Sequence, residues 1–159
     1  MLRKAIHLLV IVLTLAGPTA VSRVFTQPAR AATLSADLDK ALKESKYVYI
    51  ASTRKDGTLS KAAEIWFLYH DGAVYVGSKP STWRAKRIKW GRPQATIAVG
   101  KAEGPSFKAN GAFVKEPETE KLMFETYAKK YPDGWSKYES SFRNGFKDGG
   151  HLLIKYTPQ

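Results

Sequence analysis

The stretch that decides the fold reads AAEIWFLY over residues 62–69, AVYVGS over residues 73–78 and STWRAKRIK over residues 81–89. The first two segments are rich in β-branched and aromatic residues, and Asp71-Gly72 lies between them, so they predict two antiparallel strands joined by a tight turn. The third predicts a short basic helix that Ser81 or Thr82 can cap. This order suits phosphate binding, because hydroxyls and cationic side chains would meet where the helix begins.

The sequence before this stretch predicts a helix and a hairpin. Residues 33–45 carry leucines at every fourth position, and Ser35 can cap the helix that this spacing indicates. Residues 46–54 predict a strand, and Asp56-Gly57 turns the chain into a long strand over residues 58–69.

The sequence after the basic helix predicts three more strands and one helix. Strands are expected over residues 93–100, 106–115 and 151–156, with Asn110-Gly111 as a bulge or turn in the second of them. Pro117 begins a helix that Pro132-Asp133-Gly134 closes, and a less regular aromatic stretch follows. The fold class is therefore mainly β: a closed or split β-barrel of about six antiparallel strands with helices at its rim.

The N-terminal segment resembles a secretory signal peptide. Arg3 and Lys4 precede an apolar run over residues 5–17, which is shorter than the ~20 residues that span a bilayer. Small-residue cleavage patterns end at Ser22 and at Ala31, and the second is favoured; an uncleaved anchor is the alternative. We expect residues 1–31 to be the signal, residues 32–159 to form a single domain, and the product to be exported to the periplasm or secreted, without stable membrane insertion.

Composition excludes several classes of site. The chain has 26 basic and 14 acidic residues and a net charge of +12, which favours anionic partners. Export argues against nucleic acid as the partner. There is no cysteine, which excludes disulfides, a thiol nucleophile and thiolate metal ligands, and only His70 and His151 follow the signal, so no metal site is predicted.

On these residues the chain resembles the split β-barrel of the pyridoxamine-phosphate-oxidase-like flavin and deazaflavin oxidoreductases. In that family the second strand commonly carries an apolar residue followed by Trp, as Ile65-Trp66 does, and the third strand ends in a small hydroxyl residue. A helix then supplies Lys and Arg to the cofactor phosphate, as residues 84–88 could. The resemblance covers about residues 37–114 and implies a homodimer with cofactor sites at the subunit interface.

The candidate cofactor-binding residues follow from the residue types and the resemblance together. They are Ile65, Trp66, Ser78, Lys79, Ser81, Arg84, Lys86 and Arg87. Arg84 and Lys86 are expected to hold the phosphate. Trp66 either lines the flavin pocket or is a core aromatic residue, and the aromatic cluster of Tyr127, Tyr131, Trp135 and Tyr138 is assigned mainly to packing.

These observations predict an exported FMN-type or deazaflavin-type oxidoreductase or flavin-binding protein with a small-molecule substrate. No catalytic residue is predicted, so any enzymatic chemistry would come from the cofactor. The alternatives are a haem- or tetrapyrrole-binding split barrel, and a cofactor-free module that binds an anionic ligand.

Overall fold

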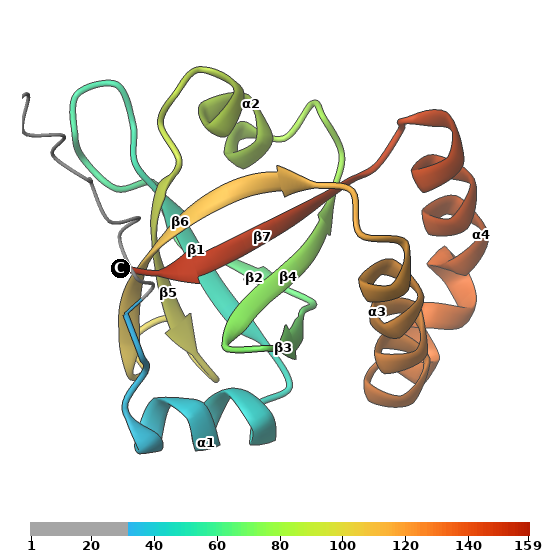
Figure 1. The fold of residues 1–159 in the computed structure, drawn as a ribbon, viewed down its shortest axis with the longest axis horizontal. Helices are drawn as coiled ribbons and strands as arrows, with labels where there is room; N and C mark the ends of the chain where they lie inside the picture. The colour runs from blue at the N-terminus through green and yellow to red at the C-terminus, as the bar shows by residue number, and fades with distance from the viewer. Residues whose placement is uncertain (1–31) are drawn as a thin grey trace, which may run out of the picture. The chain divides into compact units, whose positions relative to one another are not determined.

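Seven antiparallel strands form one sheet in the order β2-β1-β5-β6-β7-β4-β3 (Figure 1). The computed structural model describes residues 32–159, so the predicted signal peptide lies outside the described residues. In chain order the elements are α1 (Ala36–Glu44), β1 (Val48–Ser52), β2 (Ala63–Ile65), β3 (Leu68–His70), β4 (Ala73–Ser78), α2 (Trp83–Lys89), β5 (Gln94–Val99), β6 (Ser106–Val114), α3 (Pro117–Lys130), α4 (Pro132–Asp148) and β7 (Leu152–Pro158).

The sheet curls round because its two edge strands are neighbours in the chain. β2 pairs with β1 and β3 pairs with β4, at opposite edges, yet only Trp66 and Phe67 separate β2 from β3. A link of this length spans roughly 11 Å at most, so the two edges must lie close together. This geometry confirms the mainly β, split-barrel prediction. The predicted continuous strand over residues 58–69 is wrong, because the chain bends at Trp66-Phe67 and its two halves join different neighbours.

Two tyrosines hold this bend, which we call the edge link: Tyr127 of α3 and Tyr131, which follows the end of α3. The hydroxyl of Tyr127 donates a hydrogen bond to the carbonyl of Trp66 (2.9 Å), and the N–H of Phe67 donates to the hydroxyl of Tyr131 (3.1 Å). The Tyr131 hydroxyl in turn donates to the carbonyl of Lys46 (2.6 Å). These bonds stand in for the strand pairing that the bend interrupts.

Both faces of the sheet are buried, one inside the barrel and one under α3 and α4. Val74 and Val76 of β4 point into the interior with Ile97, whereas Tyr75 of the same strand belongs to the outer cluster with Met123. This alternation follows from the two-residue period of a strand. In Figure 1, α1 and α2 lie at opposite ends of the curled sheet, and α3 and α4 lie together against one side.

The predicted caps of α1 and α2 and the predicted Asp71-Gly72 turn are confirmed. Ser35 accepts a hydrogen bond from the N–H of Leu38 at the start of α1, and Thr82 accepts one from the N–H of Ala85 at the start of α2. Asp71-Gly72 connects β3 to β4 with positive φ at both residues, 48° and 70°, as a tight hairpin turn requires.

The less regular stretch predicted after residue 134 is wrong, because α4 is a helix of 17 residues. Gly134 and Gly145 lowered its apparent helix propensity. Each is needed for close packing: a Cβ at Gly134 would overlap the ring of Trp66, and one at Gly145 would overlap the ring of His151. The structure thus has seven strands and four helices among residues 32–159, where six and three were predicted.

Asn110-Gly111 forms neither a bulge nor a turn. Gln94 pairs with Asn110 and Gly111 pairs with Tyr156 in unbroken ladders on both sides of β6. A Cβ at Gly111 would lie 2.7 Å from Cε1 of Tyr156 and 2.8 Å from Cδ1 of Ile88. The glycine therefore lets α2 pack closely on β6. Within residues 32–159, no helix is both long and apolar enough to span a membrane.

Candidate functional site

A cationic cleft of about 550 Å³ lies between α2 and the segment that joins β1 to β2. The joining segment and α2 lie at the same end of the curled sheet, at the top of Figure 1. The cleft contains four cations, three hydroxyl residues and no carboxylate; its lining residues are Ile50, Ser52, Arg54, Ser60, Lys61, Ala63, Thr82, Trp83, Arg84 and Arg87. We call it the arginine cleft.

Local hydrogen bonds fix the start of α2 and therefore the position of its arginines. The hydroxyl of Thr82 donates to the carbonyl of Lys79 (2.9 Å) and lies 2.8 Å from the hydroxyl of the buried Ser78. Arg84 and Arg87 are three residues apart, so both fall on the helix face that borders the cleft. Ala85, which is buried, faces the barrel core.

Arg87 ties the two walls of the cleft together, and Arg54 orders one of them. Nη1 of Arg87 donates to the hydroxyl of Ser52 on β1 at 2.5 Å. Nη1 of Arg54 donates to the carbonyl of Leu59 at 2.5 Å and to the hydroxyl of Thr58 at 3.1 Å, which orders the β1–β2 segment. A guanidinium has five N–H donors, so both side chains keep donors for a ligand.

The positive charge in the cleft is not neutralised by the protein. Among residues 32–159, no carboxylate forms an ion pair with Arg54, Lys61, Arg84 or Arg87. Burial lowers the pKa of the Arg84 guanidinium, whereas the nearby Tyr156 and Tyr127 raise it less. A half-buried cation without a counter-ion is costly, so an anionic ligand would stabilise this arrangement.

The structure brings two of the eight predicted residues, Arg84 and Arg87, into this cleft. Lys86 lies on the other side of α2, with its Nζ 5.0 Å from the ring centre of Trp83, and it lines a different cleft. Ser78 is buried against Thr82, and Lys79 and Ser81 are exposed in the turn before α2.

The remaining two predicted residues lie on the edge link and beside it. Ile65 packs against the barrel core. Trp66 stacks on Tyr131 with ring centres 4.6 Å apart and planes 4° apart, and Tyr127 meets it edge-on at 5.7 Å. Trp66 thus takes part in aromatic packing between the edge link and α3.

Sequence reasoning missed Ser52, Arg54, Ser60 and Lys61 as site residues. The pairing of β1 with β2 and the bridge between Thr53 and Leu59 place the two ends of the segment beside each other. The signal in the sequence was the Arg54-Lys55 pair next to the Asp56-Gly57 turn. Its proximity to α2 depends on the curl of the sheet, which no local pattern shows.

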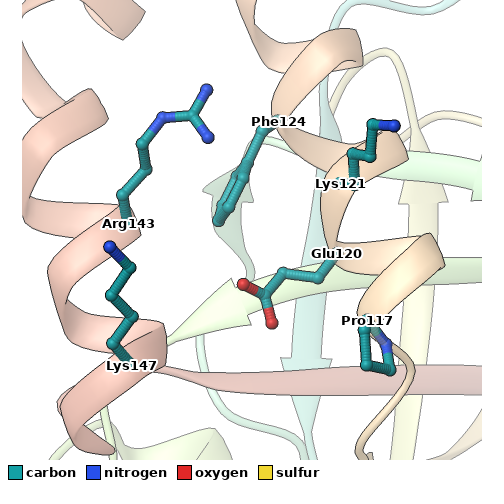
Figure 2. A pocket seen from close by; sticks show the side chains of 6 residues that line it. All are labelled: Pro117, Glu120, Lys121, Phe124, Arg143 and Lys147. Carbon is teal, nitrogen blue, oxygen red and sulfur yellow. The ribbon is translucent and has the colours of Figure 1, made fainter.

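A second, smaller cleft of about 230 Å³ lies between α3 and α4 (Figure 2). Phe124 and Arg143 face each other across it, with Cζ of Arg143 4.9 Å from the ring centre, and Lys121 points away from α4. Arg143 already forms an ion pair with Glu139 at 2.8 Å. Burial raises the pKa of Glu120. These contacts pack two helices together, so we favour the arginine cleft as the functional site.

His70 and His151, the histidines within residues 32–159, do not form a metal centre. His70 lies 3.3 Å from Asp71 in the β3–β4 turn, and His151 stacks on Phe142 with ring centres 4.7 Å apart. In the part of the chain that the structure describes, no group of three or more His, Cys, Asp or Glu residues could hold a metal ion.

Solved structures share this fold at low sequence identity. A candidate pyridoxamine 5'-phosphate oxidase from Listeria innocua is 13% identical over 77% of this chain and 91% of its own, with a TM-score of 0.55. HutZ, the heme storage protein from Vibrio cholerae, is 14% identical over 80% and 92%, with a TM-score of 0.51. A FAD-binding protein from Mesorhizobium loti is 20% identical over 81% and 93%, with a TM-score of 0.51.

The curled sheet and these likenesses define the fold: a split barrel of the kind seen in pyridoxamine 5'-phosphate oxidase-like structures. A search of curated proteins finds no match. Residues 37–147 match the profile of a family described as "Uncharacterized protein conserved in bacteria (DUF2255)". The chain belongs to this family.

Proposed function

We propose that the protein binds a phosphate-bearing flavin-type cofactor, FMN or a deazaflavin, in the arginine cleft and serves as an oxidoreductase or flavin-binding protein. The observation that carries the proposal is a cleft with four cations and no carboxylate, in which the half-buried Arg84 has no acidic partner among the described residues. Guanidinium groups bind phosphate through paired, charge-assisted hydrogen bonds.

The residues of the cleft fit such a group. Arg84 and Arg87 would bind the phosphate, and the hydroxyls of Ser60 and Thr82 would complete its hydrogen bonding. Trp83 gives the cleft an aromatic wall against which part of a ring system could lie. When bound, a flavin supplies hydride or electron transfer, and the protein contributes binding, orientation and electrostatics. A small-molecule substrate would then be the second partner.

Haem is the second candidate, because its propionates are anionic and a structural relative is named as a heme storage protein. Haem iron needs an axial ligand such as His, Cys, Met or Tyr. None of the residues that line the arginine cleft is of these types. The donor set therefore favours a flavin over haem, and the absorption spectrum of the purified protein separates them from each other and from a cofactor-free module.

Two further parts of the proposal come from the sequence. The N-terminal pattern supports export after cleavage near Ala31, which the intact mass of the extracytoplasmic protein would test. The family resemblance supports a homodimer, which light scattering at micromolar concentration would test. A species that keeps Met1, or a monomer mass, would contradict the respective part.

The test of the cleft is a titration of FMN with the double variant Arg84→Ala/Arg87→Ala. A hydrogen bond to a charged group contributes roughly 1.5–3 kcal/mol, so loss of both arginines should weaken binding by more than tenfold and reduce its salt dependence. Circular dichroism checks that the variant is folded, because Arg87 also bonds to Ser52.

The matched control is Lys86→Ala/Lys89→Ala, which removes the same charge from the same helix outside the arginine cleft. This control should keep FMN affinity within about threefold of the wild type, the change expected from the general field of a basic protein. Equal weakening in both double variants, or no binding by the wild type, would refute the proposed site.

A further inference from the structure

The outer surface of α2 carries an unusual set of exposed aromatic side chains. Five large apolar side chains are exposed among residues 32–159, and three of them lie here: Trp83 (63% exposed), Trp90 (52%) and Phe113 of β6 (39%). The rings of Trp83 and Trp90 are 6.3 Å apart. Together with Lys86 and Lys89 we call this surface the tryptophan face.

The tryptophan face is basic as well as aromatic. Lys86 lies over Trp83, and Cζ of Arg92 lies 5.1 Å from the ring centre of Trp90. A hollow of about 460 Å³ between α2 and β6 is lined by Pro80, Ala85, Lys86, Lys89, Trp90, Phe113 and Leu152, without a carboxylate. Its occupant should therefore be anionic as well as partly apolar.

We propose that the tryptophan face docks the protein on an anionic lipid surface. Tryptophan concentrates at membrane–water interfaces, where its ring lies at the level of the headgroups, and lysine extends its charge to lipid phosphates from an apolar stem. α2 is suited to lie flat on such a surface, because its inner face is anchored in the protein by Ala85 and Ile88. This contact is peripheral. Trp83 borders both surfaces, since it also lines the arginine cleft, but Arg84 and Arg87 line only the cleft, and Lys86 and Lys89 line only the hollow.

The charge of the face disfavours a second copy of the chain as its occupant. A two-fold contact centred on this face would bury Lys86 and Lys89 of both copies, four lysines in all, within one interface. No carboxylate lines the hollow to compensate for them. A lipid surface with anionic headgroups is complementary to the face over its whole area.

The proposal predicts selective binding to anionic vesicles. The folded chain should sediment with vesicles of 70% phosphatidylcholine and 30% phosphatidylglycerol and remain in solution with phosphatidylcholine alone. Each lysine near such a surface is worth about fivefold in binding, so Lys86→Ala/Lys89→Ala should weaken it by roughly thirtyfold. Trp90→Ala/Phe113→Ala should weaken binding at high salt as well, because the apolar part of the contact is not screened.

Two control variants separate this surface from general charge and from the cofactor site. Lys129→Ala/Lys137→Ala removes two exposed charges from α3 and α4. Arg84→Ala/Arg87→Ala removes two of the four cations that line the arginine cleft. Both should keep vesicle binding within about threefold of the wild type. The two double variants of α2 should thus lose different activities: Arg84→Ala/Arg87→Ala should lose FMN binding, and Lys86→Ala/Lys89→Ala should lose vesicle binding.

Three results would overturn the proposal. They are equal binding to both kinds of vesicle, a loss in the Lys129/Lys137 control as large as in the Lys86/Lys89 variant, and a dimer in light scattering that Trp90→Ala/Phe113→Ala converts to a monomer. The last result would mean that a second copy covers the face.

Discussion

Replacing Tyr131 by Phe tests the edge link, on which the curl of the sheet depends. The substitution keeps the ring that stacks on Trp66 and removes only the hydroxyl. The N–H of the fully buried Phe67 then loses its acceptor, whereas the carbonyl of the exposed Lys46 can bond to water. An unsatisfied buried donor costs about 1–3 kcal/mol.

We therefore expect Tyr131→Phe to lower the free energy of unfolding by about 2 kcal/mol, or Tm by roughly 5–10 °C for a domain of this size. Urea unfolding of the mature domain followed by far-UV circular dichroism measures it. Tyr138→Phe is the matched control, because Tyr138 also contacts Trp66 but is exposed. A loss below about 0.5 kcal/mol for Tyr131→Phe, in the range of ordinary surface substitutions, would refute the assignment.

Two further predictions concern buried contacts. Burial and the nearby Lys79 lower the pKa of His151, and Asp148 opposes them. The imidazole of the unfolded chain therefore binds a proton more readily than that of the folded chain. The free energy of unfolding should fall as the pH drops below about 6.5. His151→Phe should flatten the dependence of stability on pH between 7.5 and 5.5, and an unchanged slope in urea unfolding would contradict this. Gly111→Ala should destabilise the domain by about 1–3 kcal/mol through overlap with Tyr156 and Ile88, whereas Ala112→Ser, at the exposed next position, should have little effect.

The local elements of this fold are predictable from the sequence because their signals are local. Ser35 and Thr82 are caps by residue type, and Asp71-Gly72 tolerates the positive φ that its turn needs. The strand over residues 58–69 was misread because its apolar pattern continues through Trp66-Phe67. Only the hydroxyls of Tyr127 and Tyr131, some sixty residues later in the chain, make the bend stable.

The candidate site was predictable only in part, for the same reason. Arg84 and Arg87 lie on one helix, and a spacing of three residues places them on one face. Lys86 belongs to the same basic run but points to the other side of α2, and the sequence alone did not show which face meets the barrel. Arg54 and Lys61 reach the cleft through strand pairing, which local patterns do not specify.

The edge link has a consequence for solubility during and after folding. An open sheet has two edges with unpaired backbone groups, each a template for pairing with another chain. Here one two-residue connection brings both edges, β2 and β3, to the same place, and Tyr127 and Tyr131 hold that connection by hydrogen bonds. A single break in the chain between Trp66 and Phe67 would therefore free both edges at once, which makes this bond unsuitable for a new terminus or a proteolytic cut.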